Sequence, residues 1–109
     1  MSVMPQSIIP LLEKMGELQA SDLHLKTGVP PVYRVAGELR RTSLPSIPVN
    51  ARIIEKLMDP LIPPSRKHIY DELGGLDFAY NLPNGDRFRI NILRSCDQMH
   101  AAIRRVSAW

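Results

Sequence analysis

Three stretches in the second half of the chain alternate between polar and apolar residues, and this pattern limits the possible folds more than any other feature. The stretches cover residues 76–82, 87–94 and 99–104, and short turns at 83–86 and 95–98 separate them. Side chains along a strand point alternately to opposite faces, so each stretch would place its apolar residues on one face of a sheet. The sequence therefore predicts three strands joined by tight turns, with one covered face and one open face.

The first half of the chain predicts a helix followed by another group of strands. Apolar residues recur at helical spacing between Ile8 and Leu18, and Ser7 can cap the start of this helix. Residues 22–26 alternate between polar and apolar and predict a half-buried strand. Ala36-Gly37 is a two-residue connection between the next two predicted strands, which indicates a hairpin.

Two short helices are predicted between the two groups of strands. Residues 49–58 carry an apolar helical face that ends at Asp59-Pro60. A second helix would begin with Ser65 as its cap and end before Gly74. The predicted order is helix, three strands, two helices, three strands. This order indicates an α+β fold with a mainly antiparallel sheet and helices on one face.

The length of 109 residues corresponds to one domain, residues 1–109. The single cysteine, Cys96, excludes an internal disulfide and suits a reducing compartment. The longest uncharged run, Met1–Leu12, is too short to span a membrane, and the start of the chain has no signal-peptide pattern. We therefore expect a cytoplasmic domain.

The net charge of +3 arises entirely in residues 86–109, which contain five arginines and two aspartates. If the last turn consists of residues 95–98, Arg89 lies directly opposite Arg104 on the open face of the sheet. Like charges placed opposite each other repel, so this pair is easier to understand if an anion lies between the two side chains. The alternative is that both side chains spread into water. Arg87, at the end of its strand, and Arg105, on the opposite face, are weaker candidates.

The sequence does not indicate a nucleotide-hydrolysis, metal or nucleophile site. A P-loop needs glycine followed by lysine, but no glycine in this sequence precedes a lysine, so we expect no ATP hydrolysis by the chain alone. The histidines and Cys96 do not have the paired spacing of metal ligands, and we predict no metal site. Cys96 and His100 could form a nucleophile pair only with a third, orienting group, and none is evident. We therefore assign no catalytic residue.

Several blocks of the sequence resemble PilT-type ATPases, which retract type IV pili and belong to the secretion ATPase superfamily. These blocks are Ala-Ser-Asp-Leu-His-Leu at 20–25, Gly-Val-Pro-Pro at 28–31, Arg-Val-Ala-Gly-Glu-Leu-Arg at 34–40, Asp-Phe at 77–78 and Arg-Phe-Arg-Ile-Asn at 87–91. The resemblance extends over nearly the whole chain from about residue 7. Ala36 departs from the pattern, because the family usually has aspartate before this glycine.

The resemblance implies a PAS-like N-terminal domain, excised from a longer protein in which a RecA-like ATPase domain follows. A natural stand-alone protein is the alternative. The family implies a cytoplasmic homo-hexamer at the inner-membrane platform of the pilus, with ATP and Mg²⁺ bound at the P-loop of the second domain. By motif position, Arg89 and Arg104 would reach the ATP phosphates from this domain, whether the P-loop belongs to the same subunit or to a neighbouring one.

Two other functions remain open at this point. A PAS-like sensor or interaction module would need an enclosed pocket. A nucleic-acid-binding domain would suit the basic face, but that face has few aromatic residues for base stacking, so we expect no nucleic-acid partner. Asp22 and His24 lie in the most recognisable block without an assigned role. They could pack against the catalytic domain or belong to a solvated strand face.

Overall fold

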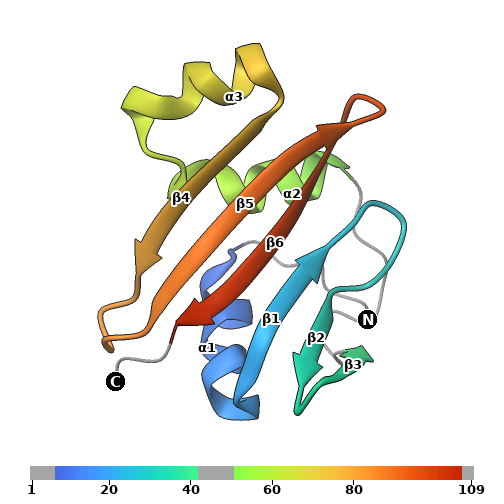
Figure 1. Cartoon of the computed structure of the whole chain (residues 1–109), viewed down its shortest axis with the longest axis vertical. Coiled ribbons are helices and arrows are strands. Elements are labelled where there is room, and N and C mark those ends of the chain that lie inside the picture. Colours follow the sequence, from blue (N-terminus) through green and yellow to red (C-terminus); the bar gives the residue numbers. More distant parts are fainter. Residues whose placement is uncertain (1–6, 42–50, 107–109) are drawn as a thin grey trace.

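A computed structural model gives the arrangement of residues 7–41 and 51–106 (Figure 1). Within these residues the elements follow the predicted order of helix, three strands, two helices and three strands. They are α1 (Ile9–Leu18), β1 (Ala20–Leu25), β2 (Val32–Val35), β3 (Glu38–Arg41), α2 (Ala51–Met58), the 3-10 turns η1 (Asp59–Leu61) and η2 (Pro64–Arg66), α3 (Lys67–Leu73), β4 (Gly75–Asn81), β5 (Arg87–Ser95) and β6 (Gln98–Val106).

The six strands form one sheet in the order β3-β2-β1-β6-β5-β4, and every neighbouring pair is antiparallel. The predicted α+β class is therefore confirmed. The two predicted groups of strands meet where β1 pairs with β6 in the middle of the sheet. Helices α1 and α2 cover one face, whereas α3 lies beyond the start of β4 (Figure 1). Among the described residues, no helix covers the other face of the sheet.

The core lies between the sheet and helices α1 and α2. The apolar positions of the alternating stretches face these helices, and Phe88, Ile90 and Ile92 of β5 are each no more than 1% exposed. The helices contribute the residues predicted from their spacing, including Leu12, Met15, Ile54 and Leu57. Burying one side chain of this size contributes about 1.5–3 kcal/mol, so this layer supplies the main stabilisation of the domain.

The helix ends agree with the predictions in part. The amide of Ile9 donates to the hydroxyl of Ser7 at 3.1 Å, so Ser7 does satisfy a free amide at the start of α1. Gly74 ends α3 in the left-handed conformation, as predicted. The predicted cap at Ser65 is wrong. Ser65 lies inside η2, and α3 begins after Arg66 without a side-chain cap, because the two prolines first impose a 3-10 turn.

Two further points concern the start of α2 and the length of the helices. The described part of α2 begins at Ala51, and the earlier residues of the predicted helix, Val49 and Asn50, lie outside the described residues. No helix in the described ranges has the length and apolar character needed to cross a membrane.

The β2–β3 hairpin turns through two residues with positive φ, Ala36 at 52° and Gly37 at 82°. This is the conformation of a type I′ turn, which matches the twist of the strands on either side. The left-handed region costs most residues with a Cβ about 1–2 kcal/mol. Glycine has no Cβ and avoids this cost, and asparagine tolerates the conformation better than alanine does. Ala36 is thus a local site of strain that the hairpin imposes.

We expect Ala36→Asn to raise the free energy of unfolding by about 1 kcal/mol, because it relieves this strain while the pairing of β2 with β3 is kept. Urea denaturation of the two proteins measures the difference. Gly37→Ala is the matched control and should lower the stability by a similar amount, since it adds a Cβ at the second left-handed position. A loss of stability in Ala36→Asn would contradict this account of the turn.

Candidate anion-binding site

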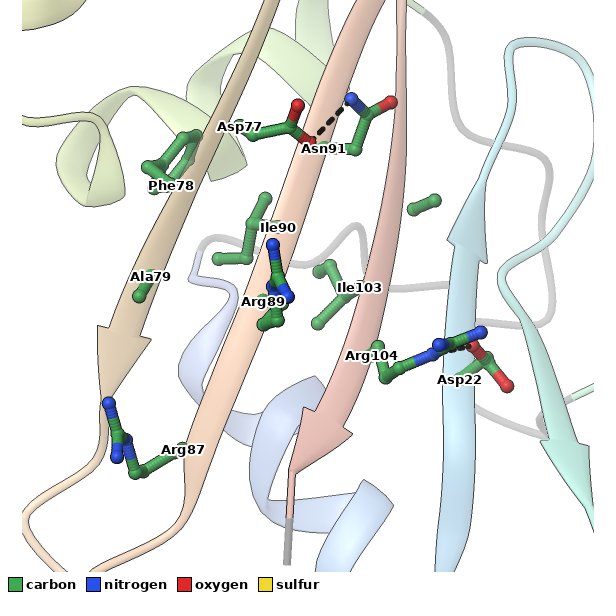
Figure 2. A pocket seen from close by; sticks show the side chains of 11 residues that line it. Asp22, Asp77, Phe78, Ala79, Arg87, Arg89, Ile90, Asn91, Ile103 and Arg104 are labelled. Carbon is green, nitrogen blue, oxygen red and sulfur yellow. Dashed lines mark hydrogen bonds and ion pairs between the residues drawn. The ribbon is translucent and has the colours of Figure 1, made fainter.

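The open face of the sheet contains a shallow depression of about 650 Å³ over β4, β5 and β6, which extends to β1 (Figure 2). Alternate residues of these strands point into it, as the polar positions of the sequence pattern predicted. Its polar side chains are Asp22, Asp77, Arg87, Arg89, Asn91 and Arg104. Three of the six are arginines, so the depression combines positive charge with side chains that can donate hydrogen bonds to an anion.

The structure confirms the predicted register of β5 and β6. Arg89 pairs with Arg104, and Arg94 pairs with Met99, across the turn at Cys96 and Asp97. Both Arg89 and Arg104 are exposed on the same face of the sheet. Arg105 points to the helix-covered face, where its Nη2 contacts Oδ1 of Asp86 at 3.2 Å. The separation of Arg104 from Arg105 onto opposite faces is therefore as predicted.

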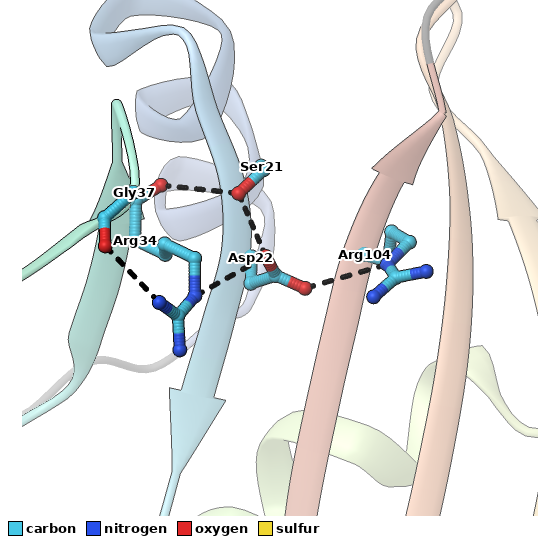
Figure 3. Close-up of polar contacts among 5 residues, drawn as sticks. All are labelled: Ser21, Asp22, Arg34, Gly37 and Arg104. Atoms are coloured by element: carbon cyan, nitrogen blue, oxygen red, sulfur yellow. Dashed lines mark hydrogen bonds and ion pairs between the residues drawn. The ribbon is translucent and has the colours of Figure 1, made fainter.

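Asp22 is the residue of the site that sequence reasoning left without a role. In the β1–β6 register it lies opposite Arg104, and in the β1–β2 register it lies opposite Arg34. Its Oδ1 is 3.5 Å from Nε of Arg104, and its Oδ2 is 3.8 Å from Nε of Arg34 (Figure 3). A row of charged side chains thus crosses four strands: Asp22 lies between Arg34 and Arg104, and Arg89 lies on the far side of Arg104.

This row changes the interpretation of the arginine pair. The side chain of Arg104 extends over β1 toward Asp22 and away from Arg89 (Figure 2). Asp22 supplies a counter-charge for Arg104 on the open face, so the charge of Arg104 is already partly balanced without an external anion. The side chains of Arg89 and Arg87 make no hydrogen bond or ion pair within the described ranges. Arg89 is therefore the arginine beside Arg104 whose donors remain available to an external anion.

The other polar residues near the depression either have partners or lie outside it. Nδ2 of Asn91 donates to Oδ1 of Asp77 at 2.9 Å, so this acid is already partnered. His24 lines a separate, smaller hollow with Lys26 and Arg34, next to the depression. Cys96 is exposed and occupies a left-handed position of the β5–β6 turn. In the described ranges no three His, Cys, Asp or Glu side chains group together in a way that could hold a metal ion.

Solved structures place this fold among motor ATPases. The chain superimposes over 96% of its length on the pilus retraction motor PilT with bound ADP, at a TM-score of 0.87 and 26% identity, and covers 30% of that chain. The ATPase DotB of Legionella pneumophila has the same fold at a TM-score of 0.72 and 19% identity, with 91% of this chain and 28% of that chain covered. The class is thus the PAS-like sheet domain of a pilus retraction ATPase.

Sequence comparison identifies the family more closely. The chain is 34% identical over 84 residues to the type IV pilus retraction ATPase PilT of Pseudomonas aeruginosa, and 33% identical over 61 residues to a twitching motility protein of Neisseria gonorrhoeae. These matches cover 77% and 56% of this chain. No protein-family model matches it. The chain is the counterpart of the N-terminal, PAS-like domain of PilT-type retraction ATPases. It spans 24% of the Pseudomonas relative and 16% of the Neisseria relative.

Proposed function

We propose that this domain contributes Arg89 and Arg104 to the phosphates of an ATP molecule held by a RecA-like ATPase domain. That domain would belong to the same subunit or a neighbouring one in a homo-hexameric motor at the cytoplasmic side of the pilus base. The observation that carries the proposal is the placement of Arg89, which is exposed in the depression directly beside Arg104 and has no side-chain partner among the described residues. The relation to a pilus motor whose structure contains ADP supports a nucleotide as the anion.

The side chains of the depression fit phosphate groups. A guanidinium group stays charged at all relevant pH values and can donate two parallel hydrogen bonds to phosphate oxygens. Arginines that approach a γ-phosphate stabilise the charge that develops in phosphoryl transfer. In this proposal the P-loop and the residues that hold Mg²⁺ belong to the RecA-like domain, because this sequence has no P-loop and its described residues have no metal-ligand cluster.

The two alternative functions have less support on this face. The hollow over β4, β5 and β6 is an open depression, whereas a sensor would need an enclosed pocket. Bases of a nucleic acid would need aromatic side chains to stack on. Phe78 and Phe88 are both buried, so neither ring can serve as a stacking platform.

Titration of the chain with inorganic triphosphate at low salt tests the proposal, with NMR amide shifts as the readout. We expect the shifts to concentrate on β5 and β6 around Arg89 and Arg104. Arg89→Ala should weaken the affinity about two- to fivefold, since an exposed charged contact contributes up to about 1 kcal/mol. Arg105→Ala, on the other face, is the control and should leave the affinity unchanged. Shifts that follow all basic residues equally, or an unchanged affinity in Arg89→Ala, would refute the proposal.

A further inference from the structure

We infer that Asp22 is a positioning residue that holds Arg104 away from the phosphate site in the unliganded domain, and that phosphate must displace this carboxylate from Arg104. The inference rests on the proposed function and assigns a role to a residue that the proposed function leaves out. It explains why Arg104 extends toward Asp22 (Figure 2), whereas the side chain of Arg89 has no partner among the described residues. The two arginines would then engage the anion in sequence, Arg89 first and Arg104 second.

The carboxylate of Asp22 is held firmly in place. Its side chain is 17% exposed, compared with 73% for Arg104. The hydroxyl of Ser21 donates to Oδ2 at 2.7 Å, and the guanidinium of Arg34 contacts the same oxygen (Figure 3). Arg34 is itself anchored, because its Nη1 donates to the carbonyl of Gly37 in the β2–β3 hairpin at 3.2 Å. The fixed partner of the ion pair is thus the acid, and the movable partner is Arg104.

The contact between Asp22 and Arg104 is weak enough to be exchanged. It is a single contact at 3.5 Å through Nε, to a guanidinium that is largely exposed. Pairs of this kind change an equilibrium by about two- to fivefold. A phosphate group carries more charge than a carboxylate and can accept two hydrogen bonds from one guanidinium. When Arg104 leaves, Asp22 keeps Ser21 and Arg34 as partners, so no buried charge is left alone.

The neutral variant Asp22→Asn tests this restraint in the same triphosphate titration. We expect it to bind triphosphate about two- to fivefold more tightly than a matched control, Asp77→Asn. Asp77 lines the same depression, and its substitution removes the same charge, but its partner is Asn91 rather than an arginine. The control therefore measures the general gain from losing one negative charge near the anion. Asp22→Glu keeps the carboxylate and should bind as the unmodified chain does.

The coupling to Arg104 separates this role from a general structural one. In an Arg104→Ala background, the gain from Asp22→Asn should fall to that of Asp77→Asn, because no arginine remains to be released. Equal gains in the two variants, or weaker binding in Asp22→Asn, would overturn the inference. If Arg89→Ala and Arg104→Ala do weaken binding in that case, the proposed function stands without the restraint. Absence of saturable binding in every variant would reject both.

Discussion

Arg89→Ala and Arg104→Ala should each lower ATP turnover at least about tenfold in a protein that joins this domain to a RecA-like ATPase domain. Each variant removes a guanidinium that the proposal places at the phosphates. A tenfold loss corresponds to about 1.4 kcal/mol of transition-state stabilisation, a small share of the ~10³-fold or greater effect that an arginine finger can have. Both side chains are exposed in the domain, so the fold should survive. Steady-state turnover at saturating ATP is the measurement.

Arg105→Ala is the control for this experiment, since it removes the same charge from the neighbouring position on the other face. Arg105 is partly buried and pairs with Asp86, so a modest loss of stability is expected and thermal unfolding should be measured alongside turnover. Turnover itself should change far less than in the other two variants. Unchanged turnover in Arg89→Ala and Arg104→Ala, with intact assembly, would show that the open face does not act on the phosphates.

The register of Arg89 and Arg104 could be predicted because it depends on a local feature. A tight turn fixes the pairing of the two strands that it joins, and the polar–apolar alternation fixes which face each residue occupies. The same reasoning placed Arg104 and Arg105 on opposite faces. Helices α1 and α2 on the covered face could be predicted from their apolar spacing. The start of α3 could not, because two prolines impose a 3-10 turn before it.

The role of Asp22 could not be predicted in this way. Its contact with Arg104 depends on the pairing of β1 with β6, which joins residues 82 positions apart. No turn connects these strands, so the sequence contains no local signal for their register. The only available signals were a polar residue on the open side of a predicted strand and a block that resembles the family. Neither of them indicates which residue of a distant strand lies opposite.

The charge balance of the open face could not be predicted for the same reason. The turn at Cys96 and Asp97 indicates the register of β5 and β6 alone. The structure adds the neighbouring strand, and with it an acid that neutralises one of the two arginines. Sequence reasoning thus identified the residues of the site from local pairing, whereas the electrostatic balance among them depends on how the two groups of strands meet.

A contact between β2 and α1 makes Tyr33 important for stability at alkaline pH. Its side chain on β2 is buried, and its hydroxyl donates to the carbonyl of Leu11 in α1 at 2.8 Å. Burial, with a smaller contribution from the charge of Glu17, raises the pKa of Tyr33 well above its ordinary value of 10. The unfolded chain therefore loses this proton at lower pH than the folded domain does. The resulting stability is complete below about pH 10 and decreases as the pH rises above it.

Tyr33→Phe should separate the two contributions of this residue. At pH 7 it should lower the free energy of unfolding by about 1 kcal/mol, because one buried hydrogen bond to α1 is lost. Above pH 10 the unmodified domain should lose up to about 1.4 kcal/mol for each further pH unit through this group, and the variant should lose less. Urea denaturation at a series of pH values from 7 to about 11.5 measures both effects.

Tyr70→Phe is the control for the alkaline effect. Burial also raises the pKa of Tyr70, but the positive charge of Arg94, which lies over its ring, opposes the shift. Tyr70 should therefore contribute less of the decline than Tyr33 does, and the Tyr33→Phe curve should be the flatter of the two above pH 10. A Tyr33→Phe domain that loses stability as steeply as the unmodified one would show that ionisation of Tyr33 does not drive alkaline unfolding. The hydrogen bond to Leu11 would then be the whole contribution of its hydroxyl group.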